Sequence, residues 1–140
     1  LNNMGAAMAG AAYDTLSRHF KHRASHPEDY DLIITGDLGQ VGSDLLYDLV
    51  SREGVDIQKY HKDCGLMIYD RDKQDVHAGG SGCGCSASVL CSFIMHRFEE
   101  GDFKNILFMS TGALMSPTSS FQGESIPGIA HLLNIRKNTT

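Results

Sequence analysis

The hydrophobic and polar positions of the chain follow helical and extended patterns in turn. Apolar residues at helical spacing predict a first helix from Met4 to Phe20 and a second that begins at Ser43 or Asp44 and is closed by Gly54. The most apolar helix is predicted beyond Ser86, because its apolar positions share one face as far as Phe98. Gly101 follows where a helix C-terminus favours glycine.

Short apolar runs predict strands at residues 30–35, 105–110 and 128–135. Because helices and strands alternate, the sequence predicts an α/β layered domain. A chain of 140 residues can bury one sizeable core but not two, so we expect one domain over residues 1–140. Ligands of such domains gather at the carboxyl ends of strands, where both glycine-bearing turns, 36–39 and 79–84, could lie.

Two stretches carry a weaker pattern. Between residues 56 and 75, charged clusters at 59–63 and 70–73 surround a short apolar run. We interpret these clusters as solvated and expect a loop there with a strand or a short helical turn. Residues 115–127 are rich in Ser, Thr, Gly and Pro, which predicts a surface loop or a hairpin connection.

Charge and hydropathy exclude some classes of function. The net charge of −5 and the sequence pI near 5.7 argue against nucleic acid as a partner, since phosphate binding needs a basic surface. No apolar stretch reaches the roughly 18 residues that span a bilayer. We therefore expect no transmembrane segment in this chain, although it could sit on a membrane complex.

The turn at residues 79–84 is the main candidate for chemistry, because four of its six residues are glycine. Glycines let a ligand or another backbone come very close. A turn that leads into a helix offers backbone N–H groups and a positive dipole end to a carboxylate, a phosphate or an oxyanion. Tight glycine turns before buried helices are also common packing devices, and the residues alone leave both interpretations open.

Cysteine and histidine give a weaker signal. The spacing of Cys64, Cys83, Cys85 and Cys91 is not that of a zinc module, so we expect free cysteines packed as small apolar side chains. A second group, His19, His22 and His26, lies near the end of the first helix, where an exposed basic tail is ordinary. We predict no metal site and no cofactor.

Several motifs resemble known families. A strand at 32–34, a turn, a helix and then a glycine-led turn before Ser86-Ala87-Ser88 resemble the C-terminal half of thiolase-like condensing enzymes such as beta-ketoacyl-acyl carrier protein synthase III. The resemblance to the stage V sporulation protein AD family is closer and covers nearly the whole chain. It rests on residues 3–9 (NMGAAMA), 34–39 (ITGDLG) and 77–88 (HAGGSGCGCSAS).

The thiolase-like resemblance implies a half-domain with a mixed sheet and helices on both faces. It also shows where the enzyme pattern is broken: Gly36 stands where the condensing enzymes carry a catalytic histidine, and Cys83 stands where they carry an asparagine. A developing oxyanion needs fixed donors, which a glycine and a thiol do not supply. The nucleophilic cysteine of those enzymes belongs to their N-terminal half. We therefore expect no enzyme activity.

The chain begins at Leu1 rather than at methionine. We expect it to be the C-terminal half-domain of a longer protein, without the first strand of that half-domain. Losing that strand would expose a sheet edge.

The family resemblance implies a non-enzymatic, dipicolinic acid-binding subunit of the SpoVA complex, which moves dipicolinic acid into the developing spore and releases it at germination. The ligand carries two carboxylates, which suit helix N-termini. The candidate ligand-binding residues are Gly36, Asp37, His77, Cys83, Gly84 and Ser86. Turn geometry is an alternative role for the glycines, and capping is one for Asp37 and Ser86. Asp37 would also need protonation or a calcium bridge to lie beside a carboxylate.

The resemblance also implies partners and a location. We expect other SpoVA proteins as partners, a homodimer of the thiolase-like type, and a peripheral position at the inner membrane of the forespore or spore. The first helix could pack on the missing half or on a second subunit through Met4, Ala7, Met8, Ala11 and Ala12. Two other functions stay open: an acyl-transferring condensing enzyme, and an interaction domain with a vestigial cleft.

Overall fold

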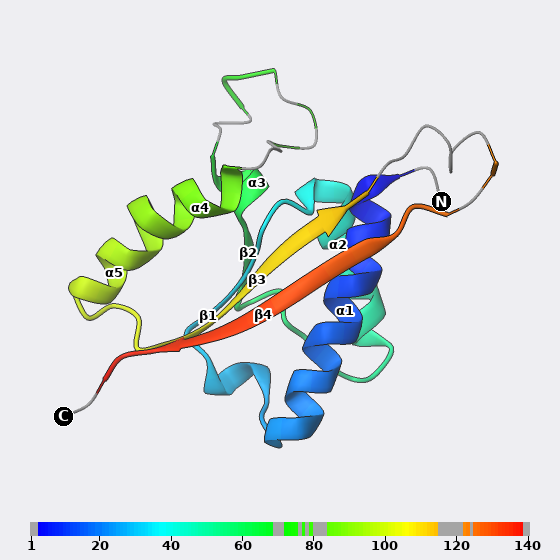
Figure 1. Ribbon diagram of the computed structural model, residues 1–140. Coiled ribbons are helices and arrows are strands. Elements are labelled where there is room, and N and C mark those ends of the chain that lie inside the picture. Colours follow the sequence, from blue (N-terminus) through cyan, green and yellow to red (C-terminus); the bar gives the residue numbers. More distant parts are fainter. Residues whose placement is uncertain are drawn as a thin grey trace.

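Figure 1 shows the computed structural model of the chain. The structure describes residues 3–68, 72–75, 77, 79, 84–114, 122–123 and 125–138. The elements are α1 (Met4–Arg23), a 3-10 turn (Pro27–Asp29), β1 (Leu32–Thr35), α2 (Gly39–Ser51), β2 (His61–Asp63), α3 (Cys64–Met67), α4 (Cys85–Val89), a π-helical segment (Leu90–Ile94), α5 (Met95–Glu99), β3 (Asn105–Ala113) and β4 (Gly128–Arg136).

The described strands form one mixed sheet with the order β2-β1-β3-β4. β1 is parallel to both of its neighbours, and Ile33 lies opposite His61 on one side and Leu107 on the other. β4 is antiparallel to β3 along its whole length. The predicted α/β class is confirmed, and the mixed sheet agrees with a thiolase-like half-domain.

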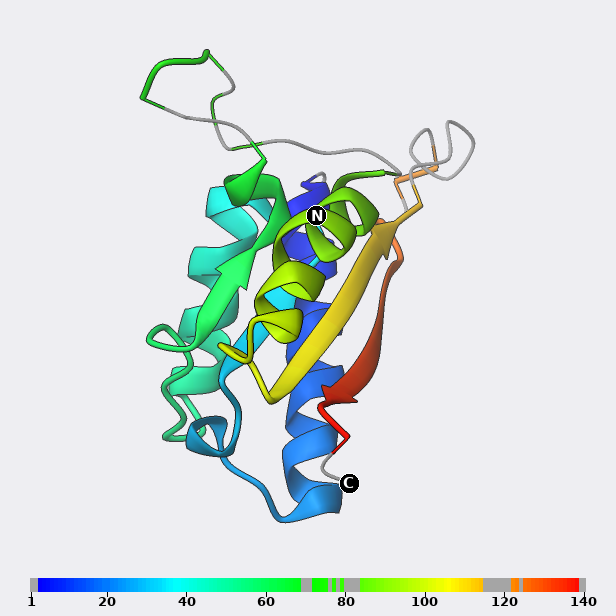
Figure 2. The ribbon, with the colours of Figure 1, turned by 90° about the vertical axis from the view of Figure 1, so that its left-hand side faces the viewer.

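Helices cover both faces of the sheet, as Figures 1 and 2 show. On one face, α1 and α2 bury Ala12, Leu16 and Leu46 against β1 and β3. On the other face, α4 and α5 bury Val89 and Phe98. β1 is buried along its entire length, which is why it reads as a continuous apolar run rather than an alternating one.

The first helix packs on its own sheet. Met8 and Ala12, which we considered for contact with a missing half or a second subunit, lie in the core instead. Small residues also let α1 approach α2 closely, since a Cβ atom on Gly42 of α2 would lie 2.9 Å from the carbonyl oxygen of Gly5. Met4 is 38% exposed and is not part of that core.

Several predicted boundaries are corrected. The second helix begins at Gly39 rather than at Ser43 or Asp44, because a side chain from another strand satisfies its first backbone amides. β3 continues to Ala113, because β4 pairs with it over its full length. Most of the expected loop at 115–127 lies outside the described residues.

The charged stretch 59–63 is the largest correction. Its last three residues form β2, in which Lys62 is exposed while His61 and Asp63 are only 7% and 2% exposed. The interpretation of this stretch as a solvated cluster is therefore wrong for His61 and Asp63. A strand sends alternate side chains to opposite faces, so one exposed lysine fits between two buried polar residues. The other cluster, at 70–73, is only partly described.

None of the helices in the described ranges is both long enough and apolar enough to cross a membrane.

Candidate functional site

The turn after β1 is tied tightly to β3. The backbone N–H of Asp37 donates to Oγ1 of Thr111 (3.1 Å), and the Thr111 hydroxyl donates back to Oδ1 of Asp37 (3.0 Å). Gly36 is buried, and a Cβ atom there would lie 3.0 Å from both the backbone nitrogen and Oγ1 of Thr111. A side chain at position 36 would therefore be crowded by Thr111 of β3.

Asp63 holds the other side of the same turn. Its Oδ1 accepts hydrogen bonds from the Leu38 backbone (2.9 Å) and from the Thr35 hydroxyl (2.6 Å), and its Oδ2 accepts from the Gly39 backbone (3.0 Å). The carboxylate thus satisfies amide groups at the beginning of α2 and places a negative charge at the positive end of the helix dipole. It does the work of an N-cap from a residue 24 positions further along the chain.

Two more polar residues extend this buried network. Thr35 Oγ1 lies 2.8 Å from Nε2 of His61, and the hydroxyl oxygen of Tyr47 lies 2.7 Å from Nδ1 of the same ring. Burial lowers the pKa of His61 to about 4, so the ring is neutral at physiological pH. Burial raises the pKa of Asp63 above its usual value, although its hydrogen bonds to Thr35, Leu38 and Gly39 act in the opposite direction.

The second glycine turn leads into α4 beside the first. Cys85, the first residue of α4, places its sulfur 3.9 Å from the carbonyl oxygen of Gly36. The N-cap of α4 is Gly84, which has no side chain to accept from the helix amides. A Cβ atom on Gly84 would have open space around it, with Oγ of Ser88 at 4.0 Å. The expectation that both glycine turns lie at one edge of the sheet is confirmed for these residues.

The glycines of this turn play different roles. Gly79 has a φ of +121°, and a Cβ atom there would lie 2.7 Å from the carbonyl oxygen of Gly65. Gly84 has a φ of −93°, which any residue adopts. Turn geometry therefore requires glycine at 79 and not at 84.

The remaining predicted site residues are not all brought together. Ser86 is half-buried in the first turn of α4, two residues past the N-cap, so the capping role we considered for it is wrong. The side chain of His77 is 88% exposed, and its Nε2 lies 3.6 Å from Oδ1 of Asp75 at the surface. Cys83 lies outside the described residues.

The cysteines of the described region are free thiols. Cys64 and Cys85 are buried, which confirms the expected packing role, whereas Cys91 is exposed and does not fit it. Burial raises the pKa of Cys64 to about 12 and raises that of Cys85 as well, with Asp37 and Asp63 adding to both effects. Both thiols are therefore protonated at neutral pH, and a thiol is a poor nucleophile.

Sequence reasoning missed the residues that organise the first turn: Thr35, Tyr47, His61 and Asp63. The sequence carries no signal for His61 and Asp63, because residues 61–63 are all polar and show no alternation of apolar and polar positions. Their alternating burial is visible only in the structure.

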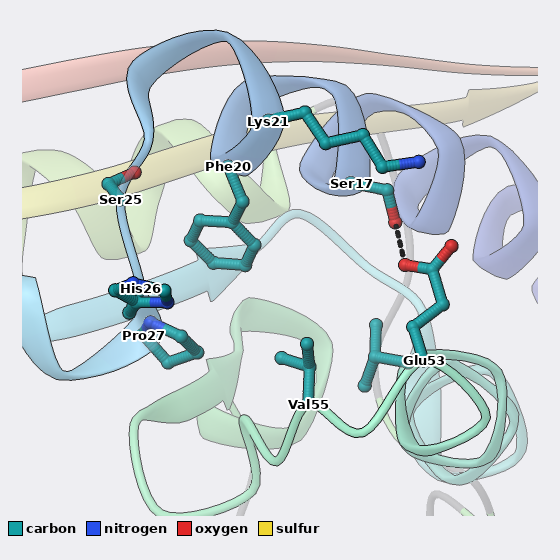
Figure 3. Close-up of a pocket in the computed structure, with 9 residues that line it drawn as sticks. Ser17, Phe20, Lys21, Ser25, His26, Pro27, Glu53 and Val55 are labelled. Carbon is teal, nitrogen blue, oxygen red and sulfur yellow. Dashed lines mark hydrogen bonds between the residues drawn. The ribbon is translucent and has the colours of Figure 1, made fainter.

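Hollows adjoin the described helices at both ends of the sheet. A groove of about 420 Å³ lies between the end of α3 and the stretch from the end of α4 into the π-helical segment, lined by Met67, Ile68, Ser88, Val89, Ser92 and Phe93. A cavity of about 440 Å³ lies at the opposite end of the sheet, where α1 and α2 end. Figure 3 shows this cavity, with Phe20 and Val55 as apolar wall and Lys21, His26 and Glu53 around it. Its Glu53 accepts hydrogen bonds from Ser17 and Tyr13.

The fold and the site together define the class of this protein: an α/β layered half-domain in which two glycine turns meet at one edge of the sheet, with a buried carboxylate beneath the first. The sequence model of the Stage V sporulation protein AD (SpoVAD) family matches residues 1–136, and the chain belongs to this family of sporulation proteins.

A relative with a curated description supports this assignment. The chain is 50% identical over 129 residues to Stage V sporulation protein AD of Bacillus subtilis (strain 168). The aligned part is 92% of this chain and 38% of the relative, so the chain spans well under half the length of that protein.

Proposed function

We propose that this chain contributes to a non-enzymatic binding site for dipicolinic acid in a sporulation protein of the SpoVA complex. The observation that carries the proposal is the meeting of the two glycine turns, at the 3.9 Å contact between Cys85 and Gly36, in a chain of the SpoVAD family. We infer that the ligand lies over the beginning of α4, with Gly84 and Ser86 beside one carboxylate.

Charge favours α4 over α2 for this ligand. The beginning of α2 already holds the Asp63 carboxylate, and Asp37 adds a second one to the turn. Like charges repel, so a dicarboxylate is received poorly there unless a cation lies between. The first amides of α4 have no capping side chain. The groove that begins beside Ser88, one turn further along, offers the apolar side chains of Met67 and Ile68 to an aromatic ring. The calcium chelate of the ligand would also offset the charge of Asp37.

The absence of catalysis belongs to the same proposal. Gly36 supplies no imidazole, and the protonated thiols of Cys64 and Cys85 are unsuited to acyl transfer. We further propose other SpoVA proteins as partners, a homodimer, and a peripheral place at the inner membrane of the forespore or spore, with a role in both uptake and release of the ligand.

The test is calorimetric titration of dipicolinic acid, with and without calcium, into the protein in its natural full length. Gly84→Val is the site variant, because the open space at Gly84 accepts a side chain that would cover the helix amides. We expect it to lower the affinity at least tenfold. Lys21→Gln, in the cavity at the opposite end of the sheet, is the matched control and should bind like the wild type.

Each other outcome has a definite meaning. If Lys21→Gln loses binding and Gly84→Val retains it, the ligand lies in the cavity of Figure 3 and the proposed place is wrong. If the folded wild type does not bind dipicolinic acid, the binding function is wrong. A covalent acyl adduct detected by mass spectrometry after incubation with an acyl thioester would instead favour the condensing enzyme.

A further inference from the structure

The buried network under the first glycine turn has a fixed direction of hydrogen bonding. The Thr35 hydroxyl has one proton, which it donates to Asp63, so its oxygen accepts from Nε2–H of His61. Since His61 is neutral, its Nδ1 carries no proton and accepts from the Tyr47 hydroxyl. The four side chains therefore form one ordered chain of donors from Tyr47 to the Asp63 carboxylate.

This ordered chain ends on the backbone of the turn. The carboxylate of Asp63 binds the amides of Leu38 and Gly39 together in an orientation that places one oxygen at each, Oδ1 at Leu38 and Oδ2 at Gly39. The Thr35 hydroxyl selects that orientation, because it binds Oδ1 at 2.6 Å from the end of β1. Thr35 and Asp63 are 0% and 2% exposed, so neither side chain reaches the surface where a ligand would bind.

We propose that Thr35 and Asp63 are positioning residues of the candidate ligand site: together they fix the 36–39 turn, against which the first residue of α4 rests. The role in ligand binding rests on the proposed function, whereas the fixing of the turn can be tested without a ligand. The contact between Cys85 and the Gly36 carbonyl is the mechanical link, because a turn that moves also moves the surface under the beginning of α4.

The cost of losing either residue follows from the network. Without the Thr35 hydroxyl, the Asp63 carboxylate is held by the Leu38 and Gly39 amides alone, and Nε2–H of His61 loses its acceptor. An asparagine in place of Asp63 keeps the shape but has only one acceptor oxygen. Its NH₂ group would face at least one of the donors, Thr35, Leu38 or Gly39, that the second carboxylate oxygen now accepts from. Both changes loosen the turn, and only the second one removes a charge.

The test uses Thr35→Val, which has nearly the same shape without the hydroxyl, and Thr35→Ser, which restores the hydroxyl. Amide hydrogen exchange in the natural full-length protein should be at least a hundredfold faster at Leu38 and Gly39 in Thr35→Val and near wild type in Thr35→Ser. The amide of Ile33, bonded to the carbonyl of Tyr60, is the internal reference and should not change. Dipicolinate affinity should fall about tenfold in Thr35→Val and stay near the wild-type value in Thr35→Ser.

The outcomes separate this inference from the proposed function. Unchanged exchange at Leu38 and Gly39 in folded Thr35→Val would overturn the positioning role. Faster exchange with unchanged dipicolinate affinity would overturn the link to the ligand and leave the binding function intact. If the wild type binds no dipicolinate, the proposed function fails while exchange still decides whether the turn is fixed. If Thr35→Val does not fold, Asp63→Asn carries the same measurement, with the same faster exchange expected.

Discussion

Two helices begin at the same edge of the sheet, and the fold treats them differently. At the beginning of α2, the Asp63 carboxylate accepts from the Leu38 and Gly39 amides. At the beginning of α4, the N-cap is Gly84, which offers no side chain. Their positive ends lie close together, since Cys85 of α4 contacts the carbonyl of Gly36 just before α2. The first amides of α2 donate to a side chain of the protein, whereas the first amides of α4 have no side-chain acceptor.

This difference decides where an anion can be received. A helix start that already holds a carboxylate binds a second one poorly. The first carboxylate already occupies the amides at the positive end of the helix dipole, and its negative charge repels the second. A helix start with a glycine cap keeps its amides accessible to close approach. The pattern of glycines made both turns look equally suitable, and only the position of Asp63 separates them.

Removing the Asp63 carboxylate should have the largest effect of any single change at this edge. Asp63→Ala leaves the Thr35 hydroxyl and the Leu38 and Gly39 amides buried without their acceptor, and we expect a loss of about 3 to 5 kcal/mol of unfolding free energy. Urea unfolding measures it. Asp44→Ala is the matched control, because the exposed Asp44 accepts only from Gln40 and should change stability by less than about 0.5 kcal/mol. Equal losses in the two variants would contradict the special role of Asp63.

The same comparison shows how far the sequence reaches. Within the described residues, helix periodicity and apolar runs predicted the three long helical segments and three of the four strands, because those signals are local. The partner of α2 is not local: Asp63 lies 24 residues beyond Gly39, and its burial depends on β2 pairing with β1. A charged residue in a charged stretch is predicted to be solvent-exposed unless the pairing of its strand is known. The family resemblance identified the glycine turns, but it did not indicate which turn is already occupied.

The protonation of His61 should give the next largest effect. Its pKa is about 4 in the folded protein against 6.5 in an exposed ring, so the unfolded chain takes up the proton first as the pH falls. The stability from this group is therefore full above pH 6.5 and decreases between pH 6.5 and 4, by up to about 3 kcal/mol.

This loss can be measured by urea unfolding at several pH values, with His61→Gln as the comparison. Glutamine can donate to Thr35 and accept from Tyr47 without titrating, so the variant should lack this part of the pH dependence. Asp63 acts in the opposite sense: its raised pKa gives a contribution that is present below 3.8 and lost as the pH rises through the folded value. Asp63 is present in both proteins, so its contribution cancels in the difference between their unfolding free energies. A difference that does not change with pH would contradict a buried neutral His61.

A methyl group added to each glycine turn should distinguish the two helix starts with a smaller effect. In Gly36→Ala the new Cβ lies 3.0 Å from the backbone nitrogen of Thr111, and we expect a loss of about 1 to 3 kcal/mol from overpacking. In Gly84→Ala the nearest atom, Oγ of Ser88, is 4.0 Å away, so the expected loss is below about 0.5 kcal/mol. Thermal unfolding of both variants checks the order, and a larger loss at Gly84 than at Gly36 would reverse our account of the two turns.

The smallest expected effect lies at the outer end of the donor chain. Tyr47→Phe removes the hydroxyl that donates to Nδ1 of His61, and leaving that acceptor without its donor should cost about 1 kcal/mol. Tyr13→Phe is the control, because its hydroxyl donates to an exposed Glu53 and should cost less. The Thr35 hydroxyl still orients Asp63 in Tyr47→Phe, so amide exchange at Leu38 and Gly39 should stay at the wild-type rate. Faster exchange there would mean that the turn is held by the whole network and not by Thr35 and Asp63, and the difference between the two helix starts would then depend on Tyr47 as well.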